Sequence, residues 1–153
     1  RLTDDGRKFL NDLDLAERRE DFILVHGTLN APNEFDYLDN FQRIAYNFEL
    51  MDRPVCFVGH LHVPHIFVED ENRALKEQKD LKVHLKPGCH YLVNVGSVGQ
   101  PRDGDPRAAY AIFDSKEKTI EIKRISYDIK AAQDKILKGG LPSRLAGRLG
   151  TGK

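Results

Sequence analysis

Apolar residues along the chain fall into two patterns, short dense runs and stripes with helical spacing. The dense runs predict buried strands. They cover residues 22–25, 55–58, 66–68, 82–85, 90–94, 108–114 and 119–125. Pro87 and Gly88 signal a turn between two of these strands, and the last two runs are expected to form a hairpin. Residues 69–79 show neither pattern and are expected to form a loop or the end of a hairpin.

The helical stripes predict three helices. Thr3 is a candidate N-cap for a helix from Asp4 to about Leu13. Residues 34–51 carry an amphipathic stripe, with a break near its start left open. A last helix is expected over residues 128–137, before Gly139-Gly140, and one more helical turn in the tail is left open. This mixture of strands and helices predicts an α/β (α+β) domain around a mostly buried sheet.

Composition narrows the class of protein. With 153 residues the chain is long enough for one domain, and its 24 basic and 24 acidic residues balance. This balance gives no reason to expect nucleic acid or an acidic membrane as a partner, and the basic tail is expected to be solvated. Cys56 and Cys89 lack metal or redox spacing and are expected to be free thiols. No membrane span or signal peptide is found, so the expected compartment is the cytoplasm.

Histidines gather at the ends of two predicted strands. His60 and His62 follow the run at 55–58, and His26 follows the run at 22–25. On an extended strand end, His60 and His62 would point the same way with Cβ atoms about 7 Å apart. That spacing suits two neighbouring cations, whereas a single histidine such as His26 is usually structural. His65 is expected to point away from the pair, in a structural or exposed position.

A loop rich in glycine and proline, residues 93–110, is the second dense signal. Such a loop can turn N–H groups toward an anion, and Arg102 or Arg107 could add donors for a phosphate. In the alternative interpretation the loop is structural, and its arginines pair with Asp103 and Asp105. The spacing matches neither the Walker motif nor the dinucleotide fingerprint.

Three stretches together resemble the calcineurin-like metallophosphoesterase superfamily, in particular its bacterial and archaeal phosphodiesterase-like branch. They are VHG at 25–27, GHLH at 59–62 and NVGSVGQPRDGDPRAAYAIFD at 94–114. Val95 stands where this branch usually has proline. Residues 125–149 also resemble the tail of the branch, so the resemblance covers essentially the whole chain. It implies a β-sandwich flanked by helices.

The resemblance also implies a dinuclear metal centre, in which His26 and His60 bind one metal ion and His62 reaches the other. The family's earlier motifs, Asp-x-His, Gly-Asp and Gly-Asn-His-Asp, are not found in the sequence. We therefore expect residues 1–153 to be a single metallophosphoesterase domain that lacks its N-terminal part. The general acid is expected upstream of Arg1, no catalytic residue can be assigned within the chain, and the chain alone is expected to be inactive.

The implied function is metal-dependent hydrolysis of phosphomonoesters or phosphodiesters by a metal-bound hydroxide. Two divalent transition-metal ions are implied, and the sequence does not choose among manganese, iron, zinc, cobalt and nickel. A small phosphoester is the expected substrate, contacted by Arg102 and Arg107. The alternative is an inactive scaffold or a single-metal interaction module. Half a domain would expose an apolar face, so the N-terminal part of the same protein or another copy is the expected partner.

Overall fold

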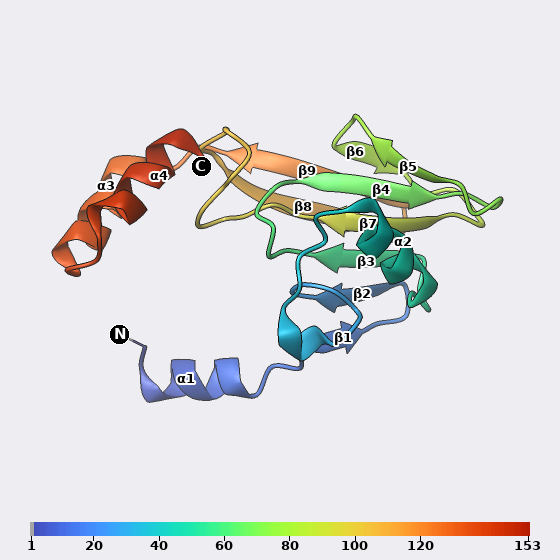
Figure 1. The fold of residues 1–153 in the computed structure, drawn as a ribbon, viewed down its shortest axis with the longest axis horizontal. Coiled ribbons are helices and arrows are strands. Elements are labelled where there is room, and N and C mark those ends of the chain that lie inside the picture. Colours follow the sequence, from blue (N-terminus) through green and yellow to red (C-terminus); the bar gives the residue numbers. More distant parts are fainter. Residues whose placement is uncertain (1) are drawn as a thin grey trace.

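The apolar strands form two sheets that pack against each other (Figure 1). The computed structural model describes residues 2–153. In spatial order the larger sheet consists of β1 (Ala16–Arg18), β2 (Phe22–Val25), β3 (Val55–Val58), β7 (His90–Asn94), β4 (His65–Glu69) and β5 (Leu75–Gln78). The smaller sheet consists of β6 (Lys82–His84), β9 (Thr119–Ile125) and β8 (Ala108–Asp114). The predicted mixed α/β fold is confirmed.

The three central strands of the larger sheet, β2, β3 and β7, are parallel. One face of this sheet packs on the smaller sheet, in a core that includes Phe57 and Ile120. The other face packs against α2 (Phe41–Glu49), through Cys56, Ile44 and neighbouring residues. Burial on both faces explains why β3 and β7 read as continuous apolar runs, whereas Leu24 of β2 is exposed. Parallel strands also end at the same edge, so the loops after β2, β3 and β7 leave the sheet together.

The helices differ from the predictions at their ends. α1 (Asp4–Asn11) is capped by Thr3 as expected, and Asp128 caps α3 (Ile129–Lys138). The predicted helix over 34–51 is wrong in its first half, where a short 3-10 helix, η1 (Pro32–Glu34), is followed by irregular chain. The tail forms a full helix, α4 (Ser143–Thr151), which packs on α3. β1 and β5 lie in segments where no strand was predicted.

The two cysteines are free thiols, as predicted. Cys56 in β3 is 0% exposed, and burial raises the pKa of its thiol to about 12. A thiol with so high a pKa stays protonated near neutral pH and is a poor metal ligand or nucleophile. Cys56 therefore belongs to the core and not to a reactive site.

Candidate metal and phosphate site

The loops after β2 and β3 bring His26 and His60 side by side. The N–H of Gly59 donates to the carbonyl oxygen of His26 at 2.9 Å, which ties the two strand ends together. The imidazole rings of His26 and His60 have centroids 5.0 Å apart and an interplanar angle of 69°. Two imidazoles this close can address one cation between them. The structure thus brings together the two residues that the family resemblance assigned to one metal ion.

His60 and His62 do not lie on an extended strand end, so that prediction is wrong. Their φ angles are 62° and 63°, in the left-handed region, and the N–H of Leu61 donates to the carbonyl oxygen of Gly59 at 2.7 Å. The chain therefore makes a tight turn at these residues. Left-handed backbone costs a residue with a Cβ atom about 1–2 kcal/mol, and such strain concentrates at functional sites.

His62 is oriented by the loop that follows β7. Its Nδ1 lies 2.8 Å from the carbonyl oxygen of Gln100. A carbonyl oxygen can only accept, so Nδ1 carries the proton and donates, and Nε2 of the neutral ring keeps its lone pair. Metal-binding histidines are commonly held in this way by a backbone carbonyl. Gln100 could not be assigned this role from the sequence, because 38 residues separate it from His62.

An aromatic side chain that the sequence analysis missed covers His60. The rings of Tyr37 and His60 are stacked, with centroids 4.2 Å apart and an interplanar angle of 29°. Phe35 also lies near His60 and His26, at centroid distances of 6.4 Å and 5.9 Å. Both lie in the segment 34–51 that was predicted to be helical. Their actual position, in the irregular segment before α2, places them beside the site.

Asn94 connects the two loops on either side of the site. It is 4% exposed, its Nδ2 donates to the carbonyl oxygen of Gly59 at 2.8 Å, and its Oδ1 accepts from the N–H of Gly96 at 3.2 Å. A buried amide held at both ends fixes the turn that carries His60. The signal that could have identified Asn94 is a polar residue directly after a run of buried apolar ones.

The pKa values of His60 and His62 both lie below the ordinary histidine value. Burial is the largest cause for each, and the positive charge of Arg102 lowers both further. For His62, Arg148 acts in the same direction, while the hydrogen bond to Gln100 opposes it. A lowered pKa favours the neutral imidazole, which is the form that binds metal. Protons therefore compete with a metal ion only under more acidic conditions.

The three histidines do not by themselves make a complete metal site in the described part of the chain. Between residues 2 and 153, no three or more histidine, cysteine, aspartate or glutamate side chains converge closely enough to hold a metal ion. His26, His60 and His62 offer imidazole nitrogens of the kind that transition metals accept, but they do not complete a coordination shell. Further ligands would have to come from groups outside the described residues. His65 lies apart from the site and contacts Glu77, with Nδ1 2.6 Å from Oε1.

The two arginines expected to contact phosphate lie in different environments. The side chain of Arg107 makes paired hydrogen bonds to Asp105, whose pKa falls to about 2 mainly because of them. Asp103 is bound by Arg124. The alternative interpretation, in which the acidic residues of the loop pair with arginines, therefore describes Arg107 well. Arg102 instead lies at the site, where its main-chain N–H donates to the main-chain carbonyl oxygen of His62 at 3.1 Å.

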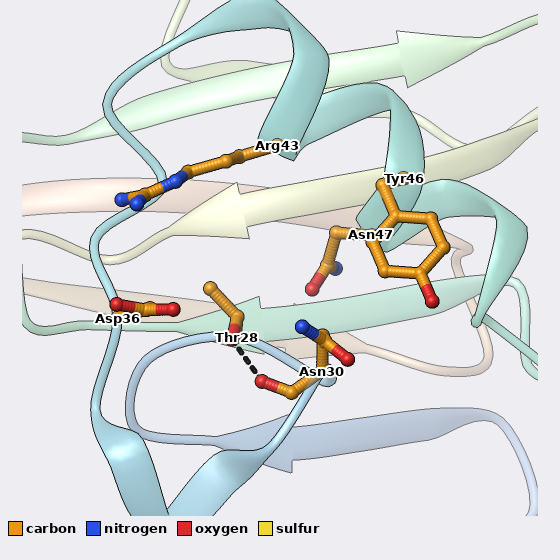
Figure 2. A pocket seen from close by; sticks show the side chains of 6 residues that line it. All are labelled: Thr28, Asn30, Asp36, Arg43, Tyr46 and Asn47. Atoms are coloured by element: carbon orange, nitrogen blue, oxygen red, sulfur yellow. Dashed lines mark hydrogen bonds between the residues drawn. The ribbon is translucent and has the colours of Figure 1, made fainter.

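A small cavity lies between the loop after β2 and the helix α2 (Figure 2). Its volume is about 60 Å³, and its lining residues are Thr28, Asn30, Asp36, Arg43, Tyr46 and Asn47. Asn47 is buried and its Oδ1 accepts from the N–H of Leu29 at 2.8 Å, which anchors the loop that begins at His26. A cavity of this size holds a few water molecules, whereas organic ligands need about 300 Å³ or more. The cavity is therefore too small to bind an organic ligand, and its wall residue Asn47 supports the loop that carries His26.

Comparison with known proteins identifies the family. Residues 3–118 match the model of the calcineurin-like phosphoesterase superfamily domain. The uncharacterized protein MJ0912 of Methanocaldococcus jannaschii is 38% identical over 157 residues, an alignment that covers 99% of this chain and 62% of that protein. The chain thus spans less than two thirds of this curated relative.

Solved structures agree with this result. The crystal structure of a metallophosphoesterase from Sphaerobacter thermophilus matches with a TM-score of 0.88 and 38% sequence identity, over 99% of this chain and 64% of that one. The hypothetical protein PH1004 from Pyrococcus horikoshii OT3 matches with a TM-score of 0.68 and 20% identity, over 97% and 55%, and shares the fold. The chain belongs to the calcineurin-like phosphoesterase superfamily, and the predicted resemblance is confirmed. Within residues 2–153, no helix is both long and apolar enough to cross a membrane.

Proposed function

We propose that the protein hydrolyses small phosphomonoesters or phosphodiesters in a metal-dependent reaction, and that His26, His60 and His62 are metal ligands. The observation that carries this proposal is the pairing of His26 and His60 at the edge where the parallel strands end, with ring centroids 5.0 Å apart. The membership of the calcineurin-like phosphoesterase superfamily supports it. The proposed cofactors are two divalent transition-metal ions, with manganese, iron, zinc, cobalt and nickel as candidates.

Each residue of the site would have a defined task. His26 and His60 would hold one cation between them, and His62 would present Nε2 toward the second. Arg102 would attract the phosphoryl group to this edge of the sheet. Bound divalent metal ions would supply Lewis acidity toward water and the phosphoryl oxygens. The general acid is proposed to lie outside this chain.

The test compares the intact protein with the isolated 153-residue chain. We expect about two metal ions per intact protein by elemental analysis, with hydrolysis of bis-p-nitrophenyl phosphate. For the isolated chain we expect fewer than one metal ion and no hydrolysis. Without metal and without hydrolysis in the intact protein, the proposal fails and the alternative of an inactive scaffold is favoured. Metal without hydrolysis would favour the metal-binding interaction module.

We further propose that another polypeptide segment covers α1 and the neighbouring part of the larger sheet. No residue of α1 is buried, and Phe9 and Leu10 are 64% and 51% exposed. Leu24 in β2 is 43% exposed. Apolar groups exposed over a contiguous area usually mark an interface. In the intact protein the proposed partner is its own N-terminal part, and in the isolated chain it is a second copy.

The oligomeric state of the isolated chain tests this partner. We expect light scattering after size-exclusion chromatography to give a dimer or a larger species. The double variant Phe9→Ser/Leu10→Ser should shift the chain toward monomer, because it removes apolar area from α1. Leu137→Ser on α3, which is 48% exposed, serves as the control and should change nothing. A monodisperse wild-type monomer would rule the partner out.

A further inference from the structure

Two aromatic side chains stand exposed beside the proposed metal ligands. Phe35 and Tyr37, which lie between η1 and α2, are 43% and 39% exposed. We propose that these two rings, the aromatic patch, bind a planar aromatic group of the substrate while the histidine site holds its phosphoryl group. This inference rests on the proposed phosphoester hydrolysis and narrows its substrates to esters that carry a planar ring, either an aryl group or a nucleobase.

The aromatic patch lies directly against the histidines. The ring of Tyr37 is stacked on His60 with centroids 4.2 Å apart, and the ring of Phe35 lies 5.9 Å from His26 and 6.4 Å from His60. Figure 1 shows the segment between β2 and α2 beside the end of the sheet where β2 and β3 finish. An organic group esterified to a phosphoryl group at the histidines is only a few bonds from phosphorus. It therefore comes within contact distance of these rings.

The main chain holds the aromatic patch in place from both sides. Gly27 packs so closely on it that an added Cβ atom would lie 3.3 Å from Cα of Phe35 and 2.8 Å from the carbonyl oxygen of the following residue. On the other side, Nη1 of Arg43 donates to the carbonyl oxygen of Tyr37 at 3.0 Å, and Leu38 is buried in the core. Rings that are fixed before a ligand arrives lose less conformational freedom when it binds.

Stability alone does not explain a phenylalanine at position 35. Phe35 has φ 52°, in the left-handed region, where a bulky side chain is strained and where glycine or asparagine would fit better. Its ring is 43% exposed, so burial of the ring returns only part of the free energy that a core phenylalanine gains. Strained residues concentrate where ligands bind. A residue that is unfavourable in both backbone and exposure indicates that its ring is used at the surface.

The chemistry of the aromatic patch favours a planar partner. Aromatic rings attract one another in offset-stacked and edge-to-face arrangements, beyond the area that they bury. Stacking on an aromatic side chain accepts any planar ring, because each has a π face. A saturated ring of the same size buries a similar apolar area but cannot stack. The aromatic patch should therefore distinguish planar from puckered groups on an otherwise identical ligand.

The test measures binding of phenylphosphonate and cyclohexylphosphonate to the intact protein by calorimetry. The two ligands share the charged group and the size of the ring, and differ in planarity. Neither can be hydrolysed as an ester, so their affinities are measured whether or not the protein is a hydrolase. We expect the wild type to bind phenylphosphonate about fivefold more tightly than cyclohexylphosphonate, as for one aromatic contact. Phe35→Leu should lose this preference, with less than a twofold change for cyclohexylphosphonate.

Three further variants separate the ring of Phe35 from its backbone and from surface aromatic residues in general. Phe35→Tyr keeps the ring and should keep the preference for phenylphosphonate. Phe35→Asn suits the left-handed backbone, so it should fold while losing the preference. Phe41→Leu is the matched control, because Phe41 begins α2 and is 64% exposed. This control should bind both phosphonates as the wild type does.

A second pair of ligands distinguishes the two sources of a planar ring. The phosphonate analogues of AMP and of ribose 5-phosphate differ only in the nucleobase. A preference for the AMP analogue that depends on Phe35 would identify the group as a nucleobase, and a preference seen only with phenylphosphonate would identify it as an aryl ring. The inference is overturned if the wild type prefers the planar member of neither pair, or if the preference survives in Phe35→Leu. A preference that depends on Phe35, without hydrolysis of bis-p-nitrophenyl phosphate, would support the aromatic patch while contradicting the proposed hydrolase function.

Discussion

His60→Asn in the intact protein is expected to lower hydrolysis of bis-p-nitrophenyl phosphate by about 100-fold or more, together with the bound metal. Loss of a residue that only supports a metal ligand typically costs about 10–100-fold, so loss of a ligand itself should cost at least the upper value. Asparagine is chosen because it tolerates the left-handed backbone of His60, whose φ is 62°. Backbone geometry should therefore survive while the imidazole is removed.

The matched control is His65→Asn. His65 starts β4, and its ring contacts Glu77 instead of the other histidines. Removing this exposed pair should change the free energy of unfolding by less than about 1 kcal/mol and leave hydrolysis unchanged. Steady-state kinetics and elemental analysis of both variants show whether His60 is a metal ligand. If His60→Asn keeps wild-type metal content and activity, His60 is not a metal ligand.

Gly96→Ala is expected to cost about 2–5 kcal/mol in the free energy of unfolding. Gly96 has φ 80°, and an added Cβ atom would lie 2.8 Å from Cβ of Ala109 and 3.0 Å from Cγ of Pro64. The left-handed backbone contributes about 1–2 kcal/mol of this, and overpacking contributes about 1–3 kcal/mol. Because Pro64 follows the histidine turn, hydrolysis should fall as well. Urea unfolding of the intact protein measures the loss.

Gly99→Ala, in the same loop, serves as the control for this substitution. No atom lies within 4 Å of the position where its Cβ would be built, and its φ is not in the left-handed region. The expected change is within about 0.5 kcal/mol. A Gly96→Ala variant as stable as Gly99→Ala would show that the loop after β7 can move away from Ala109 at little cost.

The strands of the fold could be predicted from the sequence because several of them are buried on both faces. Residues 22–25 and 55–58 were predicted with the bounds that β2 and β3 have in the structure. For residues 55–58, which are all buried, local composition and tertiary burial give the same answer. The location of the histidines followed from the same reasoning, since residues directly after parallel strands meet at one edge of the sheet.

The details of the site could not be predicted in the same way, because they depend on contacts between distant segments. The turn at His60 is held by Asn94, and the ring of His62 is held by Gln100. Neither contact leaves a periodic trace in the sequence. Phe35 fits the helical stripe, yet it has φ 52° and begins no helix. Apolar spacing alone does not distinguish a side chain in the core from one beside a functional group.

The left-handed conformation of His60 and His62 has a consequence for how this family can drift in evolution. Selection for stability alone would replace both residues with glycine, because each replacement would relieve about 1–2 kcal/mol of backbone strain. The contacts of the two rings, the entropy that glycine loses on folding and any requirement for the imidazoles oppose that change. A lineage that stopped using the site would therefore gain stability by losing these two histidines first, and their loss would mark the point at which the chemistry was abandoned.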